Sequence, residues 1–172
     1  MFQNFYLGIQ KSVKFHRFDN CPKHTNLPIY LDGVQIAQVG KMFYLYATIT
    51  SKRDVRPSLS MVLKFERCRS RDNLDSCEPY PDMTIKNVCT ISHTKGKPWS
   101  EFVEKFQPPI ECPSKKGTYV CRNASFDGIA LSAFPLSDCF WNVQILVYED
   151  GIKNGTLALC FRAEGEILNV RN

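Results

Sequence analysis

The cysteines are the residues of this chain whose number and spacing carry the clearest chemistry. An even set of eight among 172 residues is typical of disulfides formed in an oxidising compartment. The sequence has no Cys-x-x-Cys pair, and none of the three histidines, His16, His24 and His93, has a partner four residues away. Because structural zinc sites use such paired ligands, we expect no metal site, and no other motif indicates a cofactor.

The sequence also lacks the short motifs of catalysis. It contains no Gly-x-Ser-x-Gly, no phosphate-binding glycine loop and no His-Glu-x-x-His, and a fully bridged set of cysteines leaves no thiolate for a Cys-His pair. The acidic residues are spread over turns, so no two carboxylates are indicated as an acid and a base. We therefore assign no catalytic residue and predict a binding protein, with an enzyme as the least favoured interpretation.

The charge and two short triplets bear on partners and compartment. The formal net charge of +5 favours anionic lipid surfaces, but the basic residues are dispersed and lack the clustering of a nucleic-acid binder. Asn123-Ala124-Ser125 and Asn154-Gly155-Thr156 are N-glycosylation sequons, which agrees with a secretory route. No apolar run approaches the roughly 20 residues that a membrane span requires.

The elements that position these residues are predicted to be strands of one domain. A chain of this length fits a single domain, which we place at residues 18–172. Residues 1–17 are interpreted as a leader, with the remnant of a targeting segment as one explanation. Alternation and turn residues predict a hairpin over 27–39 that turns at Asp32-Gly33, and strands over 41–50, 59–66, 85–91, 117–126, 141–148 and 156–163.

One segment, residues 99–107, shows helical rather than strand periodicity. Phe102, Val103 and Phe106 fall on one helical face, and Ser100 is a candidate N-cap. Pro108-Pro109 ends the segment. The predicted fold class is therefore mainly β, an antiparallel cup or sandwich of about eight strands with one short helix.

Two short segments resemble a known family. They are the run Cys112-Pro113-Ser114-Lys115-Lys116-Gly117-Thr118-Tyr119 and the triplet Asp19-Asn20-Cys21. Both are similar to the lipid-recognition β-cup family, which includes the ganglioside or sphingolipid activators. The resemblance extends from about Phe18 to Ile167. It implies two splayed antiparallel sheets with an apolar chamber for acyl chains.

The resemblance also implies two of the disulfides. Cys21 is similar to the family cysteine that is tied to the last strand, where this sequence has Cys160. Cys89 is similar to the cysteine that is tied to the Cys-Pro corner, here Cys112. These two pairs follow the family pattern.

The other four cysteines do not map onto the family. Cys68 and Cys77 flank a polar tip and could be bridged as a hairpin clasp if their Cα atoms come within about 4.4 to 6.8 Å. Cys121 with Cys139 is then left by elimination. The pairing of these four cysteines stays open.

Apolar side chains alternate along several of the predicted strands. From periodicity alone, a filled sandwich core is the simpler interpretation, since strands that line a cavity alternate in the same way. The resemblance instead implies a lipid cavity. The expected lining residues are Phe43, Leu45, Met61, Leu63, Phe65, Trp141, Val143, Ile145, Leu159 and Phe161.

The resemblance further implies a rim that touches membranes. The loop over 132–136 is similar to an apolar rim loop of the family, which makes Phe134 and Leu136 candidate membrane contacts. Residues 67–77 stand where a second apolar loop is expected but are charged, so Arg69 and Arg71 are expected to contact anionic head groups. A solvated loop, or a carrier that never touches a membrane, is the alternative.

The function expected from these features is lipid binding without bond breaking. We expect a secreted or lysosomal protein that extracts or carries an amphipathic lipid, such as a glycolipid, with a lysosomal glycosidase as the partner to which the lipid is presented. The alternative is an extracellular chemosensory or pheromone-response accessory protein that binds a small hydrophobic ligand. Nucleic acid is not an expected partner.

Overall fold

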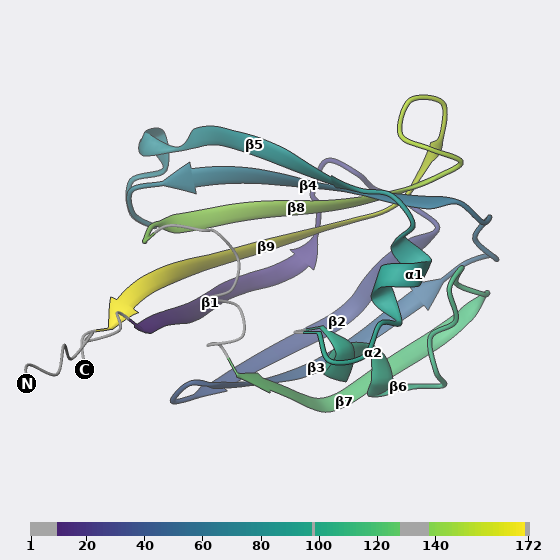
Figure 1. Ribbon diagram of the computed structural model, residues 1–172, viewed down its shortest axis with the longest axis horizontal. Helices are drawn as coiled ribbons and strands as arrows, with labels where there is room; N and C mark the ends of the chain where they lie inside the picture. Colours follow the sequence, from purple (N-terminus) through teal and green to yellow (C-terminus); the bar gives the residue numbers. More distant parts are fainter. Residues whose placement is uncertain (1–9, 98, 128–137, 171–172) are drawn as a thin grey trace, which may run out of the picture.

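The computed structural model describes residues 10–97, 99–127 and 138–170 of the chain. Two antiparallel sheets face one another (Figure 1). The five-stranded sheet has the order β1 (Gln10–Asn20), β9 (Thr156–Val170), β8 (Phe140–Glu149), β4 (Leu59–Cys68), β5 (Glu78–Ile85). The four-stranded sheet has the order β2 (Ile29–Val39), β3 (Met42–Ser51), β7 (Gly117–Asp127), β6 (Phe106–Gln107). The mainly β, antiparallel sandwich or cup expected from the sequence is confirmed.

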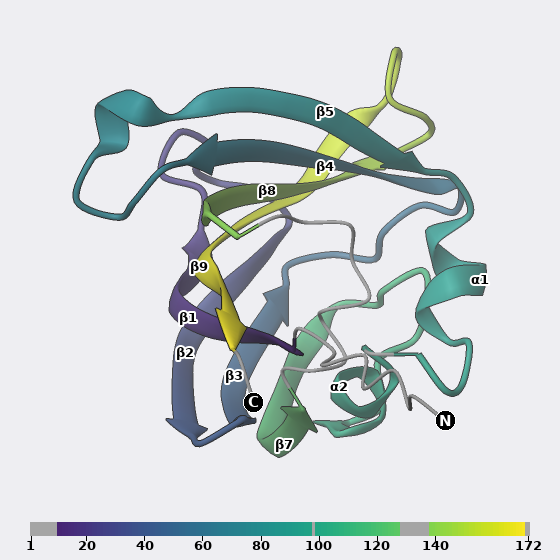
Figure 2. The ribbon, with the colours of Figure 1, turned by 60° about the vertical axis from the view of Figure 1, so that its left-hand side comes forward.

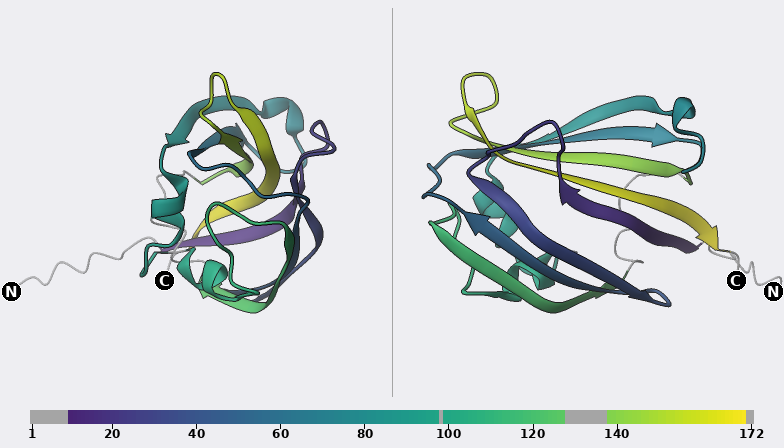
Figure 3. Two further views of the ribbon diagram at one scale, coloured as in Figure 1. Left: turned by 90° about the vertical axis from the view of Figure 1, so that its right-hand side faces the viewer. Right: turned by 180° about the vertical axis from the view of Figure 1, so that it is seen from behind.

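The two sheets diverge from one end of the molecule to the other (Figure 3, right). At the closed end, which holds the β8–β9 hairpin and the β3–β4 loop, Ile29 and Leu31 of one sheet pack with Leu59, Val147 and Phe161 of the other. At the open end lie the β2–β3 hairpin and the ends of β4 and β9. None of the helices in the described part of the chain has the length and apolar content to span a bilayer.

The first strand begins earlier than the sequence analysis places it. β1 starts at Gln10 and pairs along its length with β9, so residues 10–17 belong to the five-stranded sheet rather than to a leader. Val13 of this strand is buried between the sheets. Because the alternation of β1 is mixed with basic residues, the strand is recognised only once its partner β9 is known.

The predicted hairpin over 27–39 is a single strand, β2. Its register with β3 shifts between Leu31 and Val34, so Asp32-Gly33 forms a bulge inside the strand instead of a turn. Gly33 has φ +107°, a conformation that glycine adopts without steric cost. The chain turns later, at Gly40, between β2 and β3.

The predicted strand over 85–91 is also wrong. Cys89 lies on helix α1 (Val88–Ser92), and the strand precedes it as β5. β5 is an exposed edge strand that contains Pro79 and Pro81. Proline is tolerated at an edge because the missing N–H would face solvent. The two prolines are the reason that the sequence pattern did not predict this strand.

The predicted helix over 99–107 is shorter in the structure. Helix α2 spans Ser100–Glu104, and Phe106 and Gln107 form β6 beside β7. Ser100 is not the N-cap: its hydroxyl accepts a hydrogen bond from the Lys97 backbone N–H and donates one to the Thr94 carbonyl. These bonds secure the preceding turn. Helix α2 lies against β7 (Figure 2), and Ser125 of that strand donates a hydrogen bond to Glu101.

Three disulfides form among the eight cysteines. Cys21–Cys160, Cys68–Cys77 and Cys89–Cys112 have Cα–Cα distances of 5.5, 4.0 and 5.2 Å. Cys21–Cys160 and Cys89–Cys112 are the pairs that the resemblance implies, and Cys68–Cys77 is the hairpin clasp that the sequence left open. The three bridges fit a protein that folds in an oxidising compartment.

The fourth expected pair, Cys121 with Cys139, does not form a disulfide. Cys121 lies on β7, in the cluster beneath helix α2. Cys139 immediately precedes β8 of the other sheet and packs with a different cluster. The pair inferred by elimination is therefore wrong, because Cys121 lies in one sheet and Cys139 lies at the start of a strand of the other.

Each member of the Asp19-Asn20-Cys21 triplet has a partner of its own. Asp19 receives two hydrogen bonds from Arg162, at 2.5 and 3.1 Å, across the β1–β9 pair. The Asn20 amide group donates to the carbonyl of Leu31 and accepts from its N–H, at 2.9 and 2.8 Å. With the Cys21 disulfide, the triplet joins β1 to β9 and to the first strand of the other sheet.

Candidate functional site

A cavity lies on the face of the five-stranded sheet that is turned toward the other sheet. Its volume is about 260 Å³, and nearly all of its lining is apolar. The lining residues come from four neighbouring strands, at alternate positions along β1, β4 and β8, whereas β9 contributes the consecutive residues Ala163, Glu164 and Gly165 as well as Ile167. The lining residues are Val13 and Phe15 of β1, Leu63 and Phe65 of β4, Trp141, Val143 and Ile145 of β8, and Ala163, Glu164, Gly165 and Ile167 of β9.

Aromatic side chains cluster at and beside this cavity, whose lining includes Phe15, Phe65 and Trp141 but not Tyr80 or Phe43. Phe65, Tyr80 and Trp141 contact one another edge to face, with ring centroids 5.1 to 6.4 Å apart. Phe15 meets Phe43 of the facing sheet in the same geometry, at 5.1 Å. Such pairs add to the stability supplied by burial. The rings therefore form a rigid apolar surface where the two sheets begin to separate.

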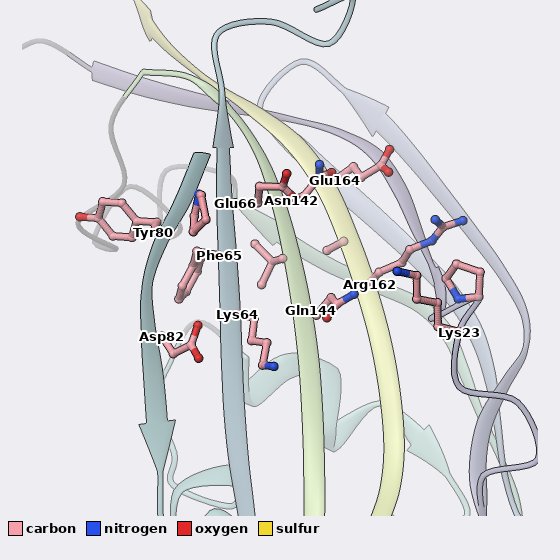
Figure 4. A pocket seen from close by; sticks show the side chains of 14 residues that line it. Lys23, Lys64, Phe65, Glu66, Tyr80, Asp82, Asn142, Gln144, Arg162 and Glu164 are labelled. Carbon is pink, nitrogen blue, oxygen red and sulfur yellow. The ribbon is translucent and has the colours of Figure 1, made fainter. Parts of the chain in front are cut away.

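The opposite face of the same strands is polar. Figure 4 shows Lys64, Glu66, Gln144, Arg162 and Glu164 on this face, next in sequence to the residues that line the cavity. They border a surface hollow of about 410 Å³. Because both signs of charge are interspersed, this face has the character of a hydrated surface. The cavity on the other face is the stronger candidate for a ligand site.

The structure brings half of the ten expected cavity residues together. Leu63, Phe65, Trp141, Val143 and Ile145 line the cavity.

The other five expected residues are packed elsewhere. Phe43 is fully buried beside Trp141, and Leu45 packs with the cluster beneath α2. Met61, Leu159 and Phe161 pack with the closed-end cluster, where the sheets meet. Alternation predicted which face they share, but it carries no information about where along a strand the sheets separate.

Sequence reasoning missed the lining residues of β1 and of the end of β9. Val13 and Phe15 lie in the segment that was interpreted in part as a leader. Ala163, Gly165 and Ile167 continue the alternation of β9 beyond its expected end at residue 163. That continued alternation is the signal that could have identified them.

The expected membrane rim is described only in part. Phe134 and Leu136 lie outside the described residues. Arg69 and Arg71 are exposed in the tip between β4 and β5, which the Cys68–Cys77 disulfide closes. The Nη2 atom of Arg67, in β4, lies 3.7 Å from the Oε2 atom of Glu78.

Three exposed apolar side chains occur at the open end, one of them in the same tip as Arg69 and Arg71. Val39 at the end of β2 is 68% exposed, and Leu74 in the 3₁₀ turn η1 (Leu74–Ser76) is 61% exposed. Leu168, near the end of β9, is 45% exposed. These three element ends lie on the same side of the molecule (Figure 1). The open end thus combines apolar and basic groups.

The chain was compared with protein-family models and with curated proteins. Neither comparison gave a match. The β-cup family is therefore carried forward as a proposal, and the cavity must be interpreted from its own geometry.

An ion-pair network holds the closed end of the cup together. Glu149 has no exposed side-chain surface, and it accepts hydrogen bonds from the Arg53 guanidinium at 2.6 and 3.1 Å. Arg56 adds bonds to the same carboxylate from its backbone N–H, at 3.0 Å, and from Nε, at 3.1 Å. The network ties the β3–β4 loop to the β8–β9 hairpin.

The pKa of Glu149 lies below the ordinary carboxyl value of 4.5. Burial acts to raise this pKa, but it is outweighed by the hydrogen bonds from Arg53 and the Arg56 backbone and by the charges of both arginines. The carboxylate therefore stays ionised in mildly acidic surroundings. Its role is structural, because every bond it accepts comes from the loop that it anchors.

Other reactive groups of the described chain are poorly placed for chemistry. Burial raises the pKa of the Cys121 thiol, which disfavours the nucleophilic thiolate. Within residues 10–97, 99–127 and 138–170, no three His, Cys, Asp or Glu side chains come together as metal ligands would.

Both candidate glycosylation sites are exposed. Asn123 lies on β7, where its side-chain oxygen accepts a hydrogen bond from Tyr46 at 3.2 Å. Asn154 lies in the turn between β8 and β9. A glycan can be attached at either place without disturbing the core, and its presence stays a prediction.

A leucine that lines a cavity should contribute less to stability than one in a packed core. We expect Leu63→Ala to lower the free energy of unfolding by less than about 2 kcal/mol, because part of its side chain faces open space. The matched control is Leu146→Ala, buried in the cluster around Cys21 and Cys160, which should cost about 2 to 5 kcal/mol. Urea unfolding measures both, and equal losses would contradict an open cavity.

Proposed function

We propose that the protein is a secreted or lysosomal lipid-binding protein that carries an amphipathic lipid between its sheets. The apolar cavity on the inner face of the five-stranded sheet is the observation that carries this proposal. A pocket with almost no polar lining has few groups that could polarise a bond, but it is suited to an alkyl chain. Binding without catalysis is thus the function that its chemistry supports best.

The resemblance to the β-cup family supports the same function. Ganglioside activators present lipids to hydrolases, so delivery to a lysosomal glycosidase is the extension that the resemblance implies for this chain. The low pKa of Glu149 is compatible with an acidic compartment, since the closed end keeps its ion pairs there. The three disulfides are equally compatible with secretion.

The cavity size favours a second candidate. At about 260 Å³, the cavity is smaller than the roughly 300 to 1,000 Å³ that is usual for sites of drug-sized ligands. That volume holds a single chain segment or one small hydrophobic molecule. A chemosensory accessory protein would need room for no more than the latter.

Native mass spectrometry of the protein purified from eukaryotic cells tests the function and separates the two candidates. A copurified acyl lipid is the result expected for a lipid carrier. A small hydrophobic molecule without an acyl chain would favour the chemosensory alternative. An empty protein that also binds no lipid added from vesicles would contradict the lipid carrier, and one that in addition binds no small hydrophobic probe would contradict both.

If the open end contacts membranes, the apolar and the basic contributions to vesicle binding should depend differently on ionic strength. Val39→Ser with Leu74→Ser should weaken binding to phosphatidylserine-containing vesicles at every ionic strength, since each apolar side chain contributes at most about 1.5 to 3 kcal/mol. Arg69→Ala with Arg71→Ala should weaken it at low salt by about 1 kcal/mol per residue. That second effect should fade as the Debye length shrinks to about 8 Å at physiological ionic strength.

Vesicle cosedimentation over a salt series measures both effects. The matched control is Lys95→Ala, an exposed lysine in the segment that joins helices α1 and α2, away from the open end. If both double variants bind as the parent does, the protein does not meet membranes through its open end, and a carrier that stays in solution replaces this part of the proposal.

A further inference from the structure

The edge strands of the two sheets, β1 and β2, lie next to one another. In the described part of the chain, β1 pairs only with β9 and β2 only with β3. Each edge strand therefore turns backbone groups outward without a strand partner. β1 and β2 belong to different sheets but contact one another along one side of the molecule.

Two side chains bridge β1 and β2, one near each end of the gap. Asn20 is bonded to the Leu31 backbone, and Gln38 Nε2 donates to the Val13 carbonyl at 3.1 Å. Between these two ties lies a cleft of about 520 Å³, which we name the β1–β2 cleft. It is lined by Phe15, His16, Arg17, Phe18, Asp19, Asn20, Leu31, Gly33, Val34 and Ile36.

Phe15 is the residue common to this cleft and the apolar cavity. Its side chain is partly exposed, and its ring contacts Phe43 edge to face. Both strands that border the cleft are irregular near Phe15. The register of β1 shifts between Phe15 and Arg17, and β2 bulges at Gly33.

The residue paired with Phe15 is a glycine, at which β1 and β9 approach closely. Gly165 of β9 lines the cavity and has no side chain. A Cβ atom there would lie 3.1 Å from the Lys14 carbonyl oxygen. Phe15 is therefore the side chain at which the cleft and the cavity adjoin.

We propose that the ligand enters and leaves sideways, through the β1–β2 cleft, with Phe15 as the gate. This proposal rests on the lipid-binding function proposed above. The lining suits an amphipathic molecule in transit: Phe18, Val34 and Ile36 offer an apolar path for its chain. Arg17, whose side chain is 47% exposed, and the outward backbone groups of both strands face its polar end.

Exchange kinetics of a fluorescent probe test the route. N-phenyl-1-naphthylamine is bound to the protein and then withdrawn into excess β-cyclodextrin in a stopped-flow instrument. Phe15→Ala should raise both the association and the dissociation rate by about tenfold, because one edge-to-face ring contact no longer opposes opening. Because Phe15 also lines the cavity, the association rate is the diagnostic quantity: it should rise if Phe15 is a gate, whereas loss of a lining side chain alone changes mainly the dissociation rate.

Two further variants make the result specific. Ile36→Trp narrows the cleft and should slow both rates, whereas Val143→Ala enlarges the cavity from β8, away from the cleft, and should change mainly the dissociation rate. If Phe15→Ala does not fold, Phe15→Leu, which keeps apolar volume but has no ring, should show the same direction.

The outcomes distinguish the route from the function. A parent protein that binds no probe overturns the proposed function, and the gate with it. If the parent binds but Phe15→Ala and Val143→Ala change the rates alike, or Ile36→Trp exchanges as the parent does, the cavity is filled through the open end and the gate is wrong.

Discussion

Replacing Cys21 and Cys160 together by alanine is expected to lower the free energy of unfolding by about 4 to 5 kcal/mol. The disulfide joins residues separated by 139 positions, and a cross-link that closes so long a loop removes much entropy from the unfolded chain. For a chain of this size the loss corresponds to a decrease in melting temperature of more than about 8 °C. Differential scanning calorimetry measures it.

The short disulfide provides the matched control. Cys68→Ala with Cys77→Ala opens a loop of sequence separation 9, for which the same relation gives about 2.5 to 3 kcal/mol. Peptide mapping without reduction should find the three bridges and no link between Cys121 and Cys139. A bridge between those two cysteines, or equal losses from both double variants, would contradict this account of the disulfides.

Removal of the Glu149 carboxylate is the other change with a large expected effect. Glu149→Ala should lower the free energy of unfolding by about 2 to 4 kcal/mol at neutral pH, because it leaves the Arg56 N–H and two guanidinium groups without their acceptor. The loss stays below that of a fully buried pair because Arg53 and Arg56 are half exposed. The control is Asp150→Asn, which also removes a carboxylate from Arg56 but is itself half exposed, and should cost less than about 1 kcal/mol.

The contribution of Glu149 should depend on pH in one direction. Its folded pKa lies below the ordinary value of 4.5, so the stability it supplies is fully present above that value and is lost as pH falls through the folded pKa. The stability difference between the parent and Glu149→Ala should therefore be constant from pH 7 to about 5 and shrink at lower pH. Urea unfolding over this range checks it, and a difference that grows on acidification would show that the sign is wrong.

Strands with strong alternation could be predicted from the sequence, and edge strands could not. β3, β4, β7, β8 and β9 all carry apolar residues at a period of two over much of their length. β5 carries two prolines and has no buried residue, so nothing in its sequence indicates a buried face. α1 contains β-prone residues, yet it is helical where a disulfide ties Cys89 to the corner at Cys112.

The sequence allowed us to predict which face of the sheet the site residues occupy, but not how far along the strands the site lies. Alternation identified Leu63, Val143 and Ile145 as facing the space between the sheets, and they line the cavity. It could not show where the sheets separate, because that depends on how two strands from different parts of the chain meet. For the same reason, Phe15, which lines both the β1–β2 cleft and the cavity, could not be identified from the sequence.

The Glu149 network was concealed for a related reason. Its partners Arg53 and Arg56 lie more than 90 positions away in sequence, in a segment that reads as an ordinary polar turn. A single carboxylate at the end of a strand gives no sign that it will be buried. Only the meeting of the β3–β4 loop with the β8–β9 hairpin brings the charges together.

The most direct test of the central claim is to fill the cavity. Ala163 lines it on β9, paired with Val143, while Gln144 in the adjoining strand faces the outer surface. Native mass spectrometry and titration with N-phenyl-1-naphthylamine would compare Ala163→Phe with Gln144→Phe. We predict that Ala163→Phe folds but neither copurifies with a lipid nor binds the probe, whereas Gln144→Phe binds as the parent does. Undiminished binding by a folded Ala163→Phe protein would contradict a ligand site between the sheets.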